Sequence, residues 1–178
     1  MKNHIFGLIL SCFSCVVIAN SESPYAGQEI REIKSLSQQE IVGYLNGRGL
    51  GLAKAAELNH FPGPMHVLEL SDELGLTEQQ IQKTQTVFEA MKSEAVALGA
   101  QYIAKERELD QGFTNGSMDT SHLSALLSEI GNIHAKIRYV HLNAHIKQKS
   151  LLTQHQIHLY DQLRGYEASH NGEHHQSH

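Results

Sequence analysis

Histidine is the residue type that gives this sequence its most specific chemistry. The 178-residue chain contains 13 histidines, and two of them, His141 and His145, are four positions apart. Side chains at this spacing lie on one face of an α-helix, so the two imidazoles could chelate a single divalent ion. The alternative is a pair of partly buried polar residues that hydrogen-bond to neighbouring elements.

A second group of histidines lies at the C-terminus. Residues 170–178 read His-Asn-Gly-Glu-His-His-Gln-Ser-His and contain nothing that could build a core. We expect residues 167–178 to be disordered and to bind Zn, Ni or Cu weakly. The alternative is a flexible tail whose metal affinity is incidental.

Three other histidines are not expected to bind the ion. His134 precedes His141 by seven positions, about 10 Å along a helix, which is too far for the two to share an ion. We expect His134 to lie in a helix seam. His155 and His158 are expected to face solvent on the last helix.

The N-terminus has the pattern of an export signal. Lys2 precedes an almost uninterrupted apolar run over residues 5–19, which also contains both cysteines, Cys12 and Cys15. The run is shorter than the ~20 residues of a membrane-spanning helix, so residues 1–19 are predicted to be a signal peptide; an uncleaved membrane anchor is the alternative. A cleaved chain has no thiol and can bind metals only through imidazole, carboxylate or thioether groups.

Helices are the elements that must position the histidines. Residues 20–36 are polar and are expected to be flexible and loosely held. Ser37 and Glu40 form a capping box that begins a short helix. Further short helices are expected over residues 50–58 and 65–74, before the longer elements begin.

Two long helices follow. Apolar residues recur every seven positions from Ile81 to Leu109, which predicts a seam against a partner helix. A turn over residues 112–116 precedes a return helix that begins at Asp119 or Thr120. A short turn between two long amphipathic helices makes them antiparallel neighbours.

The predicted fold is therefore all-α. A domain over residues 37–166 contains short N-terminal helices, an antiparallel long-helix hairpin and a short C-terminal helix that ends near Gly165. The apolar content is largely Leu, Ile and Ala, which pack between helices, and few β-branched runs argue for strands.

Composition and motifs exclude several function classes. The formal net charge of −5 gives no reason to expect nucleic-acid binding. The sequence has no His-Glu-x-x-His metalloprotease helix and no strand before a phosphate-binding loop. Residues 48–51 are glycine-rich, but they separate two short helices and are interpreted as a flexible hinge. We interpret the protein as a non-enzyme.

One short motif occurs twice. Residues 76–80 and 152–156 both read Leu-Thr-x-x-Gln, in which the threonine caps a helix and the glutamine reaches back to the cap. With these copies and the stretch 141–163, the sequence resembles the Spy/CpxP family of periplasmic proteins, and is most similar to its heavy-metal sensor and metal-resistance branch. The resemblance covers about residues 25–166. It implies a curved helical hairpin, usually dimeric, in the bacterial periplasm.

The resemblance also implies a metal site. Nickel and cobalt sensors of this type carry His-x-x-x-Met on the last long helix, completed by a histidine from the first helix. Here the pair is His141-x-x-x-His145, and imidazole in place of thioether favours Zn(II), Ni(II), Co(II) or Cu(II). His66 matches the first-helix histidine to about one residue. The predicted site is His66, His141 and His145, with Glu69 or Glu89 as the carboxylate.

Two functions follow from this resemblance. The first is a periplasmic metal-binding protein that acts in heavy-metal sensing or resistance, as a homodimer, with a membrane signalling protein as a candidate partner. The second is an ATP-independent chaperone or envelope-stress adaptor that holds unfolded client proteins. Both need the same fold, so the fold does not decide between them. The net acidic charge favours the metal function, because holding chaperones of this group tend to be basic on their concave face.

Overall fold

The computed structural model describes residues 23–166, and every regular element in this range is an α-helix. This confirms the predicted all-α class. The predicted signal peptide (residues 1–19) and the histidine-rich tail (residues 167–178) lie outside the described residues. None of the described helices is both long and apolar enough to cross a membrane. The helices are α1 (Gln38–Leu45), α2 (Lys54–Glu57), α3 (Pro64–Glu69), α4 (Glu78–Thr114), α5 (Thr120–Lys149) and α6 (Gln154–Leu163).

The chain divides into two units at Ile30. In the first unit, the described residues form turns, with the Ala26 N–H donating to the Ser23 carbonyl oxygen at 3.0 Å. The second unit holds all six helices described here.

Residues 31–36 correct the expectation that the chain is loosely held before α1. Ile33 and Leu36 are 0% and 6% exposed and belong to the main apolar core. The backbone N–H of Lys34 donates to Asp110 Oδ1 at 3.0 Å, and its Nζ lies 3.2 Å from Oδ2 of the same carboxylate. Residues 20–36 are mainly polar, so the two apolar side chains, which are three positions apart, gave no clear signal of burial in the sequence.

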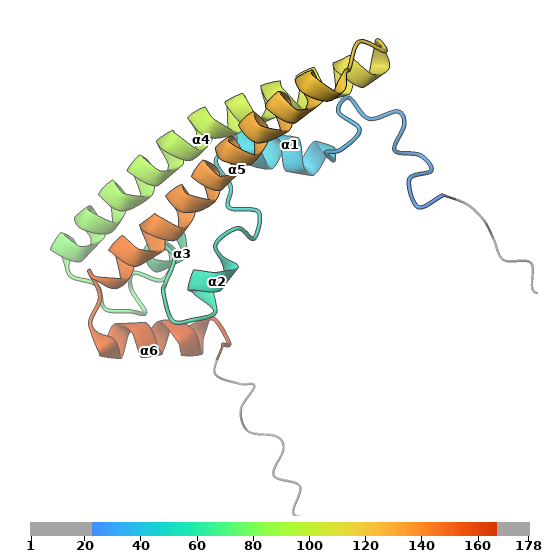
Figure 1. The fold of residues 1–178 in the computed structure, drawn as a ribbon. Coiled ribbons are helices and arrows are strands. Elements are labelled where there is room, and N and C mark those ends of the chain that lie inside the picture. The colour runs from blue at the N-terminus through green and yellow to red at the C-terminus, as the bar shows by residue number, and fades with distance from the viewer. Residues whose placement is uncertain (1–22, 167–178) are drawn as a thin grey trace, which may run out of the picture. The chain divides into compact units, whose positions relative to one another are not determined.

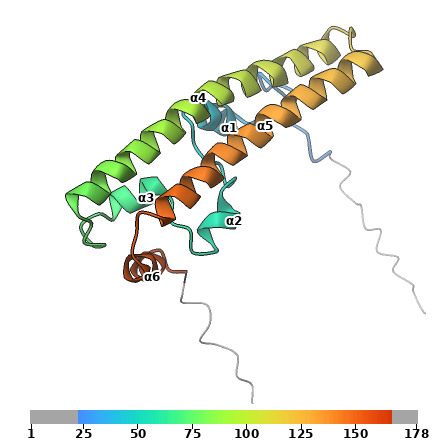
Figure 2. The same cartoon turned by 60° about the vertical axis from the view of Figure 1, so that its left-hand side comes forward.

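The two long helices, α4 and α5, lie side by side in both views (Figures 1 and 2). Thr77 and Gln80 form the capping box that begins α4, and Asp119 caps α5 by accepting a hydrogen bond from the His122 N–H at 2.8 Å. Gly116, in the turn between the helices, has a φ of 66°, which glycine adopts without steric cost.

The main apolar core lies where α1 packs on α4. The Tyr44 and Tyr102 rings have centroids 4.7 Å apart, and His134 of α5 packs 5.4 Å from Tyr102. Gly99 makes the approach of α1 possible, because an ideal Cβ at this position would lie 2.2 Å from the Tyr44 carbonyl oxygen. His134 therefore has the seam position that its spacing predicted.

Two of the short helices differ from their predicted bounds. A helix was expected over residues 50–58, but α2 begins only at Lys54, because Leu50 and Gly51 have φ values of 45° and 81°. Such left-handed residues cannot continue a right-handed helix. The helix expected over residues 65–74 ends at Glu69, and the chain continues in turns.

The repeated Leu-Thr-x-x-Gln motif joins two helix N-termini. Thr153 and Gln156 form a capping box on α6, as Thr77 and Gln80 do on α4. The two glutamines also bond to each other: Gln80 Nε2 donates to Gln156 Oε1 at 2.9 Å. Gln80 Nε2 also donates to the Leu151 carbonyl oxygen at 2.9 Å. The motif thus fixes α6 against the start of α4.

Candidate functional site

The predicted histidines share one cavity. A cavity of about 790 Å³ is lined by residues from the segment before α2, from α2 to α5, and by Arg164 at the end of α6. His66, His141 and His145 all contribute to its wall. We call this space the histidine cavity.

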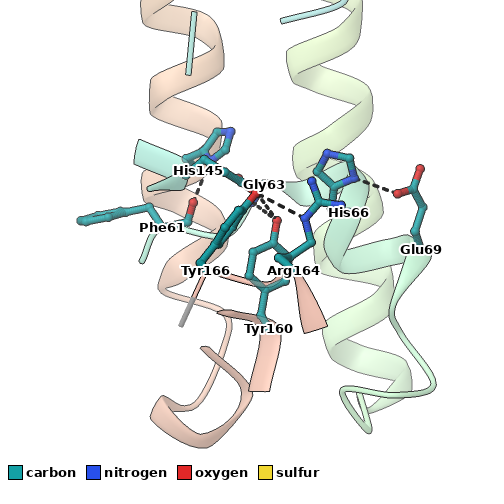
Figure 3. A network of polar contacts seen from close by, with 9 residues as sticks. Phe61, Gly63, His66, Glu69, His145, Tyr160, Arg164 and Tyr166 are labelled. Carbon is teal, nitrogen blue, oxygen red and sulfur yellow. Dashed lines mark hydrogen bonds and ion pairs between the residues drawn. The ribbon is translucent and has the colours of Figure 1, made fainter. Parts of the chain in front are cut away.

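His145 is oriented by the backbone. It is 8% exposed, and its Nδ1 lies 2.7 Å from the Phe61 carbonyl oxygen (Figure 3). Because a carbonyl oxygen only accepts, Nδ1 carries the proton, and Nε2 of the neutral ring keeps its lone pair. Histidines that bind a metal ion through one ring nitrogen usually donate a hydrogen bond from the second ring nitrogen, often to a backbone carbonyl.

His141 has no such partner. It is 4% exposed, and its Nε2 is buried without a hydrogen bond to any described residue. Burial lowers the pKa of His141, and any positive charge on the neighbouring His145 would lower it further. The ring is therefore held neutral and can offer a lone pair. A buried polar atom without a partner is rare in folded proteins and calls for an explanation.

His66 approaches the cavity from α3. Its Nδ1 lies 2.8 Å from Glu69 Oε2, as Figure 3 shows, and its side chain is 29% exposed. Glu69 is exposed and does not line the cavity. The structure therefore places Glu69 where it orients the imidazole of His66 instead of facing His141 and His145.

Glu89 lies apart from the other predicted residues. Its side chain is exposed and accepts a hydrogen bond from Gln85 Nε2 at 2.8 Å. It does not line the histidine cavity, whereas Met91, two positions further along α4, does.

Glu57 is the carboxylate that the sequence did not reveal. It lies on α2 with its side chain 14% exposed, and its Oε2 is 3.5 Å from His145 Nδ1. Its Oε1 accepts hydrogen bonds from the hydroxyls of Tyr160 at 2.5 Å and Tyr166 at 2.9 Å, and lies 3.7 Å from Arg164 Nε. Burial raises the pKa of Tyr160, and its bond to Glu57 adds to this effect.

The only local sign of this role is an acidic residue in the largely apolar stretch 52–58. That sign is weak, because glutamate is common on the exposed face of any short helix.

The ligand types fit a divalent transition metal, but the side chains are not close enough together to bind one ion. Within residues 23–166, no three His, Asp or Glu side chains are close enough together to hold an ion as they stand. Three imidazoles from α3 and α5 nevertheless line the same space, and one of them has a buried nitrogen without a partner.

Comparison with known proteins adds no relative: no family model, no curated protein and no solved structure matches the chain.

Proposed function

We propose that the protein binds one divalent transition-metal ion in the histidine cavity and acts in heavy-metal sensing or resistance in the periplasm. The observation that carries this proposal is the buried Nε2 of His141, which lines a cavity shared with His145 and His66. Neutral imidazoles suit Zn(II), Ni(II), Co(II) and Cu(II).

The hydrogen bonds around the cavity support this reading. The Phe61 carbonyl oxygen holds His145, and the Glu69 carboxylate holds His66, so each ring has a defined tautomer. Outer partners of this kind raise the basicity of a ligating imidazole. Glu57 is the nearest carboxylate to His145 and is available as a fourth ligand if its tyrosine partners release it.

The proposed architecture is an antiparallel hairpin of α4 and α5 that associates as a homodimer. A membrane signalling protein is the proposed partner of the sensor, and a change at the cavity would reach such a partner through α6. Tyr160 and Arg164 link α6 to Glu57, so movement of this carboxylate onto the metal ion would loosen the link.

The test is calorimetric titration of each of the four ions into the full chain in which the tail histidines are replaced by serine. We expect one ion per chain with a Kd below about 1 μM. The double variant His141→Ala/His145→Ala should weaken binding at least ~100-fold, because chelation by two rings is lost. His134→Ala is the matched control on the same helix and should bind as the parent does. Equal affinity in all three proteins would contradict the proposal.

A holding chaperone for unfolded clients is the second candidate. It is favoured by apolar side chains exposed on the short helices and their connections, notably Leu45 (44%), Leu58 (59%) and Met65 (44%). Exposed apolar groups of this kind can bind unfolded chains. If metal titration shows only the weak binding of scattered histidines, suppression of client aggregation becomes the deciding assay.

A further inference from the structure

The histidine cavity has an excess of positive charge. Among the described residues, its wall includes four cationic side chains and one carboxylate, that of Glu57; the cations are Arg48, Lys54, Lys92 and Arg164. The chain as a whole has a formal net charge of −5. The cavity is therefore opposite in sign to the rest of the protein, and concentrated charge of one sign in a concave site attracts small ions of the other sign.

These cations are poorly neutralised by the protein itself. Among the described residues, no carboxylate lies within ion-pair distance of Arg48, Lys54 or Lys92. Lys92 has only a ring contact, with Nζ 5.8 Å from the centroid of Phe88. Three cations elsewhere in this unit do pair with carboxylates at 3.2 Å or less: Lys34, Lys105 and Arg107.

A row of free backbone donors lies beside these cations. The N–H groups of Gly49, Leu50 and Gly51 donate to no acceptor among the described residues, and all three residues line the cavity. Successive amides in a turn, or where a right-handed residue precedes a left-handed one, form concave anion-binding sites.

The segment that carries these amides has an unusual backbone conformation. Leu50 has a φ of 45°, which is uncommon for a residue with a side chain. The approach is close on two sides: an ideal Cβ on Gly43 would lie 2.6 Å from Leu50 Cδ2, and one on Gly47 would lie 3.0 Å from the Lys92 carbonyl oxygen. Leu50 thus packs on Gly43 of α1, and Gly47, just before the segment, packs on α4.

We propose that the histidine cavity binds a small multivalent oxyanion, carrying phosphate or carboxylate groups, through the N–H groups of Gly49, Leu50 and Gly51 and the side chains of Arg48 and Lys92. A cavity of about 790 Å³ is large enough for such a molecule. This inference goes beyond the proposed metal function, because the cations and amides are present whether or not a metal ion binds. When both bind, the anion offsets the positive charge that otherwise opposes a divalent cation.

The experiment is calorimetric titration of the full chain, freed of metal on a chelating resin, with citrate and with inorganic phosphate. We expect one anion per chain, with affinity that falls as chloride is raised. The double variant Arg48→Gln/Lys92→Gln should raise the Kd at least ~10-fold. The matched control, Lys83→Gln/Arg138→Gln, removes two cations of α4 and α5 that do not line the cavity and should leave the Kd unchanged.

Saturable binding of either probe that depends on Arg48 and Lys92 supports the proposal, and the tighter probe identifies the preferred group. Absence of saturable binding up to about 10 mM, weaker than any ordinary specific site, overturns it. An equal loss in the control pair also overturns it, because binding would then follow net charge alone.

A second measurement uses the unsubstituted chain, so its outcome does not depend on whether a variant folds. In amide NMR spectra of the full chain, phosphate should shift the signals of Gly49, Leu50 and Gly51 most strongly. Shifts confined to other parts of the chain overturn the proposal. The metal titration is run without phosphate or citrate, so either proposal can fail while the other stands.

Discussion

Helix α5 contributes histidine to two regions that use it differently. In the aromatic core, formed by Tyr44, Tyr102 and His134, the imidazole packs against rings with centroids 5.4 and 6.4 Å away. In the histidine cavity, two turns further along, His141 and His145 line an open space instead of packing against aromatic rings. The same residue type on one helix thus packs against aromatic rings in one region and lines a cavity in the other, according to what lies opposite.

Glycine produces the difference. In the aromatic core, Gly99 lets α1 sit directly on α4, and the space is filled by tyrosine rings. At the cavity, Gly49 and Gly63 face the histidines, where an ideal Cβ would lie 3.5 Å from His141 Nδ1 and 3.0 Å from His145 Cε1. In the aromatic core, glycine allows two helices to come into contact. At the histidine cavity, the missing side chains of Gly49 and Gly63 leave space beside the imidazoles.

The largest expected effect is a break in the aromatic core. Gly99→Ala places a Cβ against the Tyr44 backbone, which cannot move without displacing α1, so we expect the free energy of unfolding to fall by about 3 kcal/mol. Urea denaturation measures the change. Gly131→Ala is the control on α5: its Cβ meets nothing within 4 Å, and alanine should stabilise the helix by about 0.5–1 kcal/mol. Equal losses in the two variants would show that the contact of α1 with α4 is not tight.

The next effect separates the two cavity histidines in the metal-free protein. His145→Leu leaves the Phe61 carbonyl without its donor and should cost about 1–3 kcal/mol. His141→Leu removes a buried nitrogen that has no partner and should be neutral or stabilising. Chemical denaturation of both variants tests this order. The reverse order would mean that His141 has a partner that matters more than the bond of His145.

A smaller effect is expected in alkaline solution. Burial, with the charge of Glu106, raises the pKa of Tyr102, so above pH 10 the unfolded chain loses this proton first. The stabilisation is complete below about pH 10 and is lost as pH rises toward the folded pKa, by at most ~1.4 kcal/mol per pH unit. Tyr102→Phe should reduce this slope in pH-dependent denaturation. Tyr139→Phe, at a tyrosine that is 65% exposed, is the control, and identical slopes in the two variants would contradict the assignment.

The smallest effect concerns the helix that covers the aromatic core. Ser37→Ala removes the capping box of α1 and should cost about 1 kcal/mol. The hydrogen bond from Ser37 lowers the pKa of Glu40, so this contribution is present above about pH 4.5 and is lost as pH falls through the folded pKa. Thermal unfolding at pH 7 and at pH 3 tests it, with the exposed Ser128→Ala as control. A loss of the same size at both pH values would exclude Glu40 from the effect.

The helix starts could be predicted from the sequence because their causes are local. Ser37, Thr77 and Thr153 each bond to a residue three positions on, and the structure shows all three capping boxes. Asp119 begins α5 in the same local way. The all-α class follows from helical periodicity for a similar reason, because each signal lies within a few turns of the chain.

The predicted start of α2 was wrong, because the feature that delays this helix is a tertiary contact and not a local sequence signal. Leu50 takes a left-handed conformation while it packs against Gly43, and residues 50–53 are therefore not helical, although their composition suits a helix. Tertiary contact overrides helix propensity at such positions, since propensity is worth less than 1 kcal/mol per residue.

In the candidate site, too, the residues placed by local spacing could be predicted and those placed by long-range contacts could not. The spacing of His141 and His145 put both rings on one helix face, and the structure places them with His66 along one cavity. Glu57 could not be recognised, because its role depends on Tyr160, 103 positions away in the chain. The sequence by itself determined the helices and the pair of imidazoles, through contacts three or four residues apart. Only the tertiary structure decided which carboxylate, cations and amides surround them, because those contacts join segments that no local pattern connects.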